Sequence, residues 1–272
     1  MPSPLSVARA VVAAVTVGLA ITVGVVLPSC SCSDRAGPVD REKQAPAAEE
    51  VGAETPARSG VSGRVETATV APSPAAADAP PACAGAVPFD EVVRGADGGV
   101  ADALVVLRPA LGPVPVPPPA PAPPRDVDLV LRRCSFQPAV QVAPVGSTLT
   151  VRSEDPLIHT AHLRLVDGGG ERNVQNLVLP PSTGPVRVKL TQPGLVRVRS
   201  DQYPFMGAFI LVTAGELAAV TDDEGHFDIP TAGPGDWNAA VTHAALGEAT
   251  STVEVTKTGP AALYVSLPAT SR

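Results

Sequence analysis

Short segments in which apolar and polar residues alternate, or in which a few apolar residues follow one another, recur through the second half of the chain. They lie at residues 104–107, 127–131, 148–151, 162–165, 186–190, 196–199, 209–212, 238–242, 252–255 and 263–267. Turn-forming sequences such as Asp97-Gly98 and Gln192-Pro193-Gly194 separate several of them. Many short strands at this spacing predict an all-β chain built from β-sandwiches.

Two segments of low complexity interrupt this pattern. Residues 33–88 contain no Leu, Ile, Met, Phe, Tyr or Trp and bury too little apolar surface to offset chain entropy, so residues 30–58 are predicted to be a flexible tether. Only residues 61–65 alternate like a strand. Residues 109–124 hold nine prolines in 16 positions, which favours a polyproline II loop inserted between two strands. A ligand for an aromatic groove is the functional alternative.

The N-terminus predicts export. Residues 10–27 form an uncharged run of 18 residues, long enough for a membrane-crossing segment. The sequence Leu27-Pro28-Ser29-Cys30 that follows resembles a bacterial lipoprotein cleavage box. We therefore predict a signal peptide at 1–29 and a lipoprotein anchored to the membrane through acyl chains on Cys30, in the periplasm or at the outer membrane. An uncleaved anchor is the alternative, and the membrane leaflet stays open.

The chain contains four cysteines, at positions 30, 32, 83 and 134. If Cys30 is acylated, Cys83 and Cys134 are the pair left inside the folded region. An oxidising compartment favours a disulfide between them. Two buried free thiols are the alternative.

Composition narrows the function classes. With 32 Pro and 24 Gly in 272 residues, a helical bundle is excluded, because proline removes a backbone donor and clashes inside a helix. The net charge of −7 argues against a nucleic-acid partner, which requires a concentrated basic surface. The sequence holds no Gly-x-Ser-x-Gly, His-Glu-x-x-His or phosphate-binding glycine loop, so no enzymatic activity is predicted.

Three elements in the middle of the chain resemble the cupredoxin-like domain of exported plastocyanin-type and methylamine-utilisation-type proteins. They are Cys134-Ser135-Phe136-Gln137-Pro138, then Ser153-Glu154-Asp155-Pro156 with His159, and finally Ser200-Asp201-Gln202-Tyr203-Pro204-Phe205-Met206. The resemblance implies a Greek-key cupredoxin-like β-sandwich at 59–213, with the Pro-rich insertion 109–124. It also implies that the second and third elements supply copper ligands.

The departures from that family are at the ligands themselves. His159 and Met206 match ligand positions, but Ser200 stands where the thiolate belongs and Tyr203 where the second histidine belongs. A blue-copper site needs the thiolate. We therefore expect a degenerate site with no cofactor. The alternative is an altered copper-binding or electron-transfer site of His159, His162 and Met206; these two histidines lie on opposite faces if they share a strand and converge only in a turn.

Residues 214–272 resemble a carboxypeptidase regulatory-like (transthyretin-like) domain, implying a second, smaller β-sandwich. The matching segments are 221–227, 234–237 and 243–247, and the first of them is predicted to be the acidic turn of a hairpin. The resemblance carries no catalytic residues.

Two aromatic residues and a methionine form a candidate surface for an envelope protein partner. Tyr203, Phe205 and Met206 stand close together in the loop where copper would bind. An apolar patch there suits protein docking, and packing into a filled site is the alternative. The sequence thus predicts a non-catalytic exported lipoprotein that acts in binding or in envelope structure.

Overall fold

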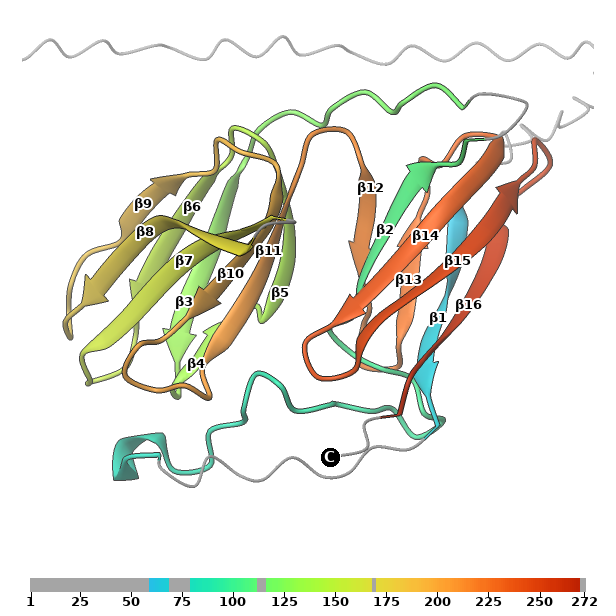
Figure 1. The fold of residues 1–272 in the computed structure, drawn as a ribbon. Helices are drawn as coiled ribbons and strands as arrows, with labels where there is room; N and C mark the ends of the chain where they lie inside the picture. The colour runs from blue at the N-terminus through green and yellow to red at the C-terminus, as the bar shows by residue number, and fades with distance from the viewer. Residues whose placement is uncertain (1–58, 69–78, 112–115, 168–169, 270–272) are drawn as a thin grey trace, which may run out of the picture. The chain divides into compact units, whose positions relative to one another are not determined.

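The structure is a computed structural model and describes residues 59–68, 79–111, 116–167 and 170–269 (Figure 1). Apart from the short 3-10 helix η1 (Pro81–Cys83), the regular structure of these residues is β-strand, which confirms the predicted all-β class. Within the described ranges, no helix is long and apolar enough to cross a membrane. The predicted signal peptide 1–29, the tether 30–58 and Cys30 lie outside them.

The first sandwich comprises residues 126–213. One sheet has the strand order β5-β11-β10-β7-β8, and the other has the order β4-β3-β6-β9. The strands are β3 (Asp126–Arg132), β4 (Ser135–Gln137), β5 (Val140–Pro144), β6 (Thr148–Ser153), β7 (His159–Asp167), β8 (Gly170–Leu179), β9 (Val186–Lys189), β10 (Gly194–Arg199) and β11 (Gly207–Thr213). Their inward Leu and Val side chains form one buried core around Phe136.

The second sandwich has a three-stranded sheet of order β13-β1-β16 and a four-stranded sheet of order β12-β2-β14-β15. Its strands are β1 (Val61–Thr67), β2 (Leu104–Pro109), β12 (Leu217–Val220), β13 (His226–Ile229), β14 (Gly235–His243), β15 (Gly247–Val255) and β16 (Ala261–Leu267). The core surrounds Trp237, the single tryptophan of the chain, which is 1% exposed.

Strands β1 and β2 differ from the predicted domain boundary, which assigned them to the first sandwich. β1 pairs with β13 and β16, and β2 pairs with β12 and β14, so both complete the second sandwich. The Pro-rich segment after β2 therefore connects the two sandwiches and is not a loop within one. Alternating apolar residues predict a strand, but they carry no information about which strand it will pair with.

The residues of β2 explain its place. Val105 and Leu107 are buried in the core of the second sandwich, whereas Leu104 and Val106 point to the other face. That other face packs in a separate buried cluster with Phe209 and Leu211 of β11. A strand that is apolar on both faces requires cover on both.

The acidic turn at 221–227 forms, but it does not belong to the predicted hairpin. The turn forms, since the N–H of Asp222 donates to the carbonyl of His226 and that of Gly225 donates to the carbonyl of Asp222. Yet β12 and β13, which it connects, belong to different sheets and make no hairpin. Thr221 is buried and bridges to the segment before β2: its hydroxyl accepts from the N–H of Ala103 at 2.8 Å.

The predicted disulfide between Cys83 and Cys134 is present. It joins η1, which precedes β2, to the turn between β3 and β4. Both cysteines are buried, at 2% and 1% exposure. In the chain-entropy model a loop of this length stabilises the folded state by about 4 kcal/mol.

His243 has a structural role at the turn between β14 and β15. Its Nδ1 accepts hydrogen bonds from the N–H groups of Ala245 and Leu246, and the residue is 4% exposed. Burial lowers the pKa of His243 to about 4. The neutral imidazole is therefore the form that the fold accommodates.

The free energy of unfolding should fall as the pH drops from about 6.5 to about 4. Over this range His243 binds a proton in the unfolded chain but stays neutral in the folded chain, where its pKa is lower. The difference between the pKa of 6.5 of an unperturbed histidine and about 4 corresponds to about 3 kcal/mol. In His243→Asn, whose side-chain carbonyl accepts turn N–H groups without titrating, this part of the pH dependence should vanish. Urea unfolding followed by Trp237 fluorescence measures it, and His226→Asn at an exposed position is the matched control. A variant with an unchanged pH dependence would contradict the assignment.

Candidate functional site

Three segments far apart in sequence meet at one end of the first sandwich. They are the two-residue turn between β3 and β4, the start of β7, and the loop between β10 and β11. β7 and β10 are antiparallel neighbours, so the start of one lies beside the end of the other. The structure thus brings His159 close to the 200–206 loop, as the sequence resemblance predicted.

Ser200, at the predicted thiolate position, is 4% exposed and holds the loop through its hydroxyl. Its Oγ accepts from the N–H of Gln202 at 3.3 Å and from that of Tyr203 at 3.2 Å. It also lies 3.3 Å from the hydroxyl oxygen of Thr160. All of these partners are uncharged groups of the protein, so Ser200 serves as a turn residue of the kind that caps backbone N–H groups.

Tyr203, at the second histidine position, packs on His159. The two ring centroids lie 5.6 Å apart with the planes inclined by 69°, an edge-to-face arrangement. The ring centroids of Phe205 and Tyr203 lie 6.0 Å apart. Both rings are half-buried against the core, whereas Met206 is 1% exposed. Met206 is therefore a core residue, and a partner surface here is limited to Tyr203 and Phe205.

His159 lies between the Tyr203 ring and the Asp155 carboxylate. It is fully buried, and its Nε2 lies 3.0 Å from Oδ2 of Asp155. Nδ1 has no hydrogen-bond partner among the described residues. Burial lowers the pKa of His159, and the Asp155 carboxylate opposes this shift only in part. The ring is thus neutral at physiological pH, which is the form that binds metals.

Asp155 also holds the turn between β3 and β4. Its Oδ1 accepts from the N–H of Arg133 at 2.7 Å, and its Oδ2 accepts from that of Cys134 at 2.8 Å. Both turn residues have positive φ, 52° and 56°, a region in which side chains other than glycine are strained. Two charge-assisted hydrogen bonds offset that strain.

His162 does not join this site. It is three residues along β7 from His159. Because side chains alternate between the two faces of a strand, this odd spacing places His162 on the other side of the sheet. Its ring nitrogens lie 3.3 Å from a carboxylate oxygen of Asp201 and 3.0 Å from the side-chain oxygen of Asn173. The prediction of a metal site that combines His159, His162 and Met206 is therefore wrong.

A different cluster of ligand-type residues is present where the sequence analysis proposed only a disulfide. Ligand atoms of Cys134, Asp155 and His159 lie within 4.8 Å of one another. Only this group of three or more His, Cys, Asp or Glu residues occurs in the described part of the chain. The sequence signal was the spacing of Asp155 and His159, and nothing in the sequence places Cys134 beside them, because strand pairing brings it there.

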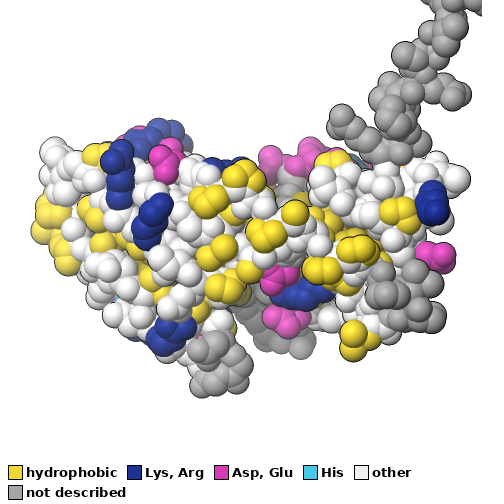
Figure 2. Space-filling view, turned by 90° about the horizontal axis from the view of Figure 1, so that it is seen from above, with side chains coloured by type: hydrophobic (Ala, Val, Ile, Leu, Met, Phe, Trp, Pro, Cys, Tyr) yellow, Lys and Arg dark blue, Asp and Glu magenta, His cyan; other side chains and the backbone are white. Residues whose placement is uncertain are grey.

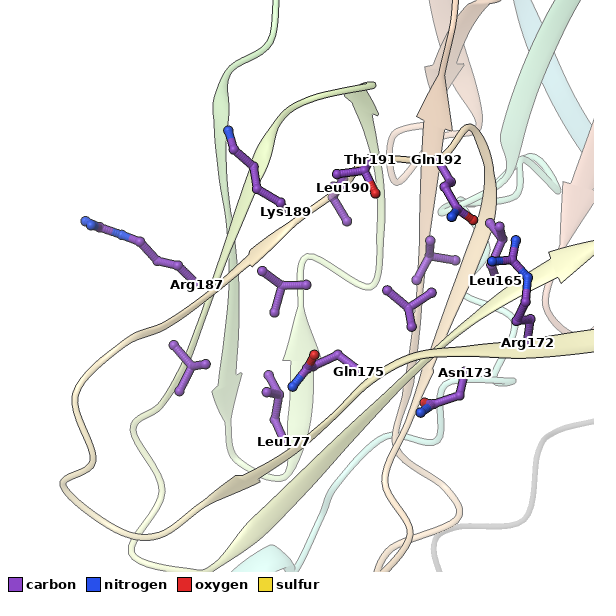
Figure 3. Close-up of a pocket in the computed structure, with 14 residues that line it drawn as sticks. Leu165, Arg172, Asn173, Gln175, Leu177, Arg187, Lys189, Leu190, Thr191 and Gln192 are labelled. Atoms are coloured by element: carbon purple, nitrogen blue, oxygen red, sulfur yellow. The ribbon is translucent and has the colours of Figure 1, made fainter.

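A cavity of about 360 Å³ lies at the open side of the first sandwich, between the edge strands β8 and β9 (Figure 3). Buried leucines and valines of the core reach it, including Leu177 and Leu190. Arg187 and Lys189 of β9 point away from it in Figure 3, consistent with their exposure. No His, Cys, Asp or Glu is among the described residues that line it.

The charged side chains of the described residues do not suggest a polyanion site on the face that Figure 2 shows. There the Lys and Arg side chains are separated by uncharged ones and do not form a continuous basic surface. Several are paired, such as Arg132 with Glu154 and Arg164 with Glu171.

No known protein-family model matches the chain, and no curated protein matches it. Parts of it are similar to solved structures of copper proteins. A purple cupredoxin from Nitrosopumilus maritimus covers 32% of this chain and 98% of its own length, with 15% identity and a TM-score of 0.28. A reduced amicyanin variant covers 32% and 81%, with 18% identity and a TM-score of 0.27. The copper-containing nitrite reductase of Thermus scotoductus SA-01 covers 39% of this chain and 25% of its own length, with 23% identity and a TM-score of 0.27. Scores this low support no functional conclusion.

The residues at the positions that match copper ligands do not fit a blue-copper site. His159 and Met206 offer an imidazole and a thioether, but the two other ligand positions hold a hydroxyl and a phenol ring. The Ser200 hydroxyl already accepts backbone N–H groups, and a serine does not replace the thiolate that a blue-copper site requires. One imidazole and one thioether are too few ligands for a stable site.

Replacing Asp155 by alanine should lower the free energy of unfolding by about 2–4 kcal/mol. The substitution removes a charged acceptor from two backbone N–H groups of a strained turn and from a buried histidine. Calorimetry or urea unfolding followed by circular dichroism measures the loss. Glu154→Ala, next to it but exposed and engaged only with surface arginines, should change stability little. Equal effects of the two substitutions would refute the role of Asp155.

Proposed function

We propose that this protein is a non-catalytic, exported lipoprotein of the cell envelope, whose first sandwich acts as a binding or structural module and not as a copper carrier. The observation that supports this most directly is the state of the 200–206 loop. Ser200 holds the loop by hydrogen bonds to Gln202 and Tyr203, so no metal–thiolate bond is needed to order it.

The protein's partner would be another envelope protein. Tyr203 and Phe205 are half-buried aromatic residues at the end of the sandwich, and they can add apolar contact area while the rest of the loop stays hydrogen-bonded. The membrane would be reached through the lipid on Cys30. No nucleic-acid partner is proposed, because the net charge is −7.

The alternative function is copper binding or electron transfer at an altered site. The observation that favours it is His159, whose Nε2 contacts Asp155 while Nδ1 has no partner among the described residues. A carboxylate behind a ligating histidine is the usual second contact of such residues. Met206, buried in the core of the first sandwich, is the other matched ligand position that keeps a copper-type side chain.

Titration of the full chain, oxidised and purified in detergent, with Cu(II) and Cu(I) separates the two functions. We expect no intense visible charge-transfer band and no stoichiometric binding that depends on His159 and Met206. A stoichiometric site that is lost in both His159→Ala and Met206→Ala would overturn the proposal and establish the alternative.

The double substitution Ser200→Cys with Tyr203→His should create a coloured copper site, because it restores a thiolate and a second imidazole beside His159 and Met206. Visible absorption after addition of one equivalent of Cu(II) tests this. Ser200→Ala with Tyr203→His, which lacks only the thiolate, should stay colourless. A colourless double variant that is folded by circular dichroism would show that the loop does not preserve the inherited ligand geometry.

A further inference from the structure

Cys134 lies at the centre of two alternative bonding arrangements. In the disulfide its Sγ is bonded to Cys83, and the same sulfur lies within 4.8 Å of ligand atoms of Asp155 and His159. A disulfide sulfur is a poor metal ligand, whereas a thiolate is among the strongest. The cluster is therefore closed to metal while the disulfide is intact.

We infer that reduction of the Cys83–Cys134 disulfide opens a binding site for a zinc-type divalent cation, with Cys134, Asp155 and His159 as protein ligands. This site shares His159 with the matched copper position but uses neither Ser200, Tyr203 nor Met206. It does not depend on the proposed function, because it concerns the reduced chain.

The ligand chemistry fits zinc. Zn²⁺ binds thiolate, imidazole and carboxylate, and sites with three protein ligands leave a fourth position open. Around a tetrahedral ion the ligand atoms lie about 3.3–3.6 Å from one another. The atoms here lie within 4.8 Å, and Nε2 of His159 is 3.0 Å from Oδ2 of Asp155. Adjustments of about 1 Å are therefore sufficient.

The surroundings keep the three ligands in place when the disulfide opens. The N–H of Cys134 donates to the Asp155 carboxylate. His159 is the first residue of β7, which pairs with β10 on one side and β8 on the other. Cys83 is held more weakly. Its 3-10 helix bonds only to neighbouring residues, Pro81 and Ala82 beside it are exposed, and the segment can open to a reductant without breaking a sheet.

The reaction balances with a dithiol as the reductant. The dithiol sulfurs become a disulfide, while two electrons and two protons pass to the sulfurs of Cys83 and Cys134. Binding of the cation then displaces the Cys134 proton to solvent. Asp155 contributes its carboxylate, and His159 contributes one ring nitrogen while the ring proton stays on the other. Bound metal would in turn protect Cys134 from reoxidation.

Two single substitutions test the site without any reductant. Both Cys83→Ser and Cys134→Ser remove the disulfide, but only the first leaves the proposed ligand as a free thiol. The full chain with Cys30→Ser and Cys32→Ser is used as background, so that no other thiol binds metal. We expect Cys83→Ser to bind one equivalent of Co²⁺ with a thiolate charge-transfer band in the near ultraviolet, Zn²⁺ to displace it, and Cys134→Ser to show neither effect.

Further variants of the Cys83→Ser chain assign the remaining ligands. His159→Gln and Asp155→Asn should each weaken cobalt binding at least tenfold, whereas His226→Gln, at an exposed position of the second sandwich, should not change it. Equal binding by Cys83→Ser and Cys134→Ser, or no binding by the folded Cys83→Ser chain, would overturn the inference.

A measurement on the chain with its disulfide intact at the start covers the case in which the variants do not fold. The same background chain is reduced with a phosphine, which takes up the oxygen of one water molecule while both sulfurs gain protons. Zn²⁺ should then slow alkylation of Cys134 but not of Cys83. Equal alkylation of both cysteines, or unfolding of the reduced chain in the presence of Zn²⁺, would refute the site. Copper binding by the oxidised chain would refute the proposed function and leave this inference unaffected.

Discussion

The Asp155 carboxylate is the interaction on which the end of the first sandwich depends. It accepts the N–H groups of Arg133 and Cys134 and contacts Nε2 of His159, so one side chain connects the β3–β4 turn to the segment between β6 and β7. Without it, two residues in the left-handed region would have to hold a tight turn unaided. The position of Cys134, and with it the disulfide, follows from this arrangement.

At the same end, hydrogen bonds and packing within the protein order the 200–206 loop. A copper–thiolate bond and a serine hydroxyl are very different in strength, yet both can hold a short loop. Ser200 does so by accepting two N–H groups, and Tyr203 covers His159 with an aromatic ring. Burial of Met206 in the core completes this packing.

Much of the fold was predictable from residue patterns, and the failures have two causes. The strands around 148–151, 196–199 and 238–242 form where alternation predicted them, since alternation reports burial of one face. The assignment of β1 and β2 to the first sandwich failed because pairing is decided by distant strands. The exposed residues of β8 gave no apolar alternation, so that strand was not predicted at all.

The sequence by itself determined the all-β class, the pair of cysteines free to form a disulfide, and the absence of a cysteine from the 200–206 loop, because each of these depends only on which residues are present. It also matched His159 to a ligand position of the cupredoxin-like resemblance. Only the tertiary structure decided that His162 turns away, that Met206 is core, and that Cys134 stands beside Asp155 and His159. The contact of Cys134 with Asp155 joins residues 21 positions apart. Proximity of that kind is a property of the packed sheets and not of the local sequence.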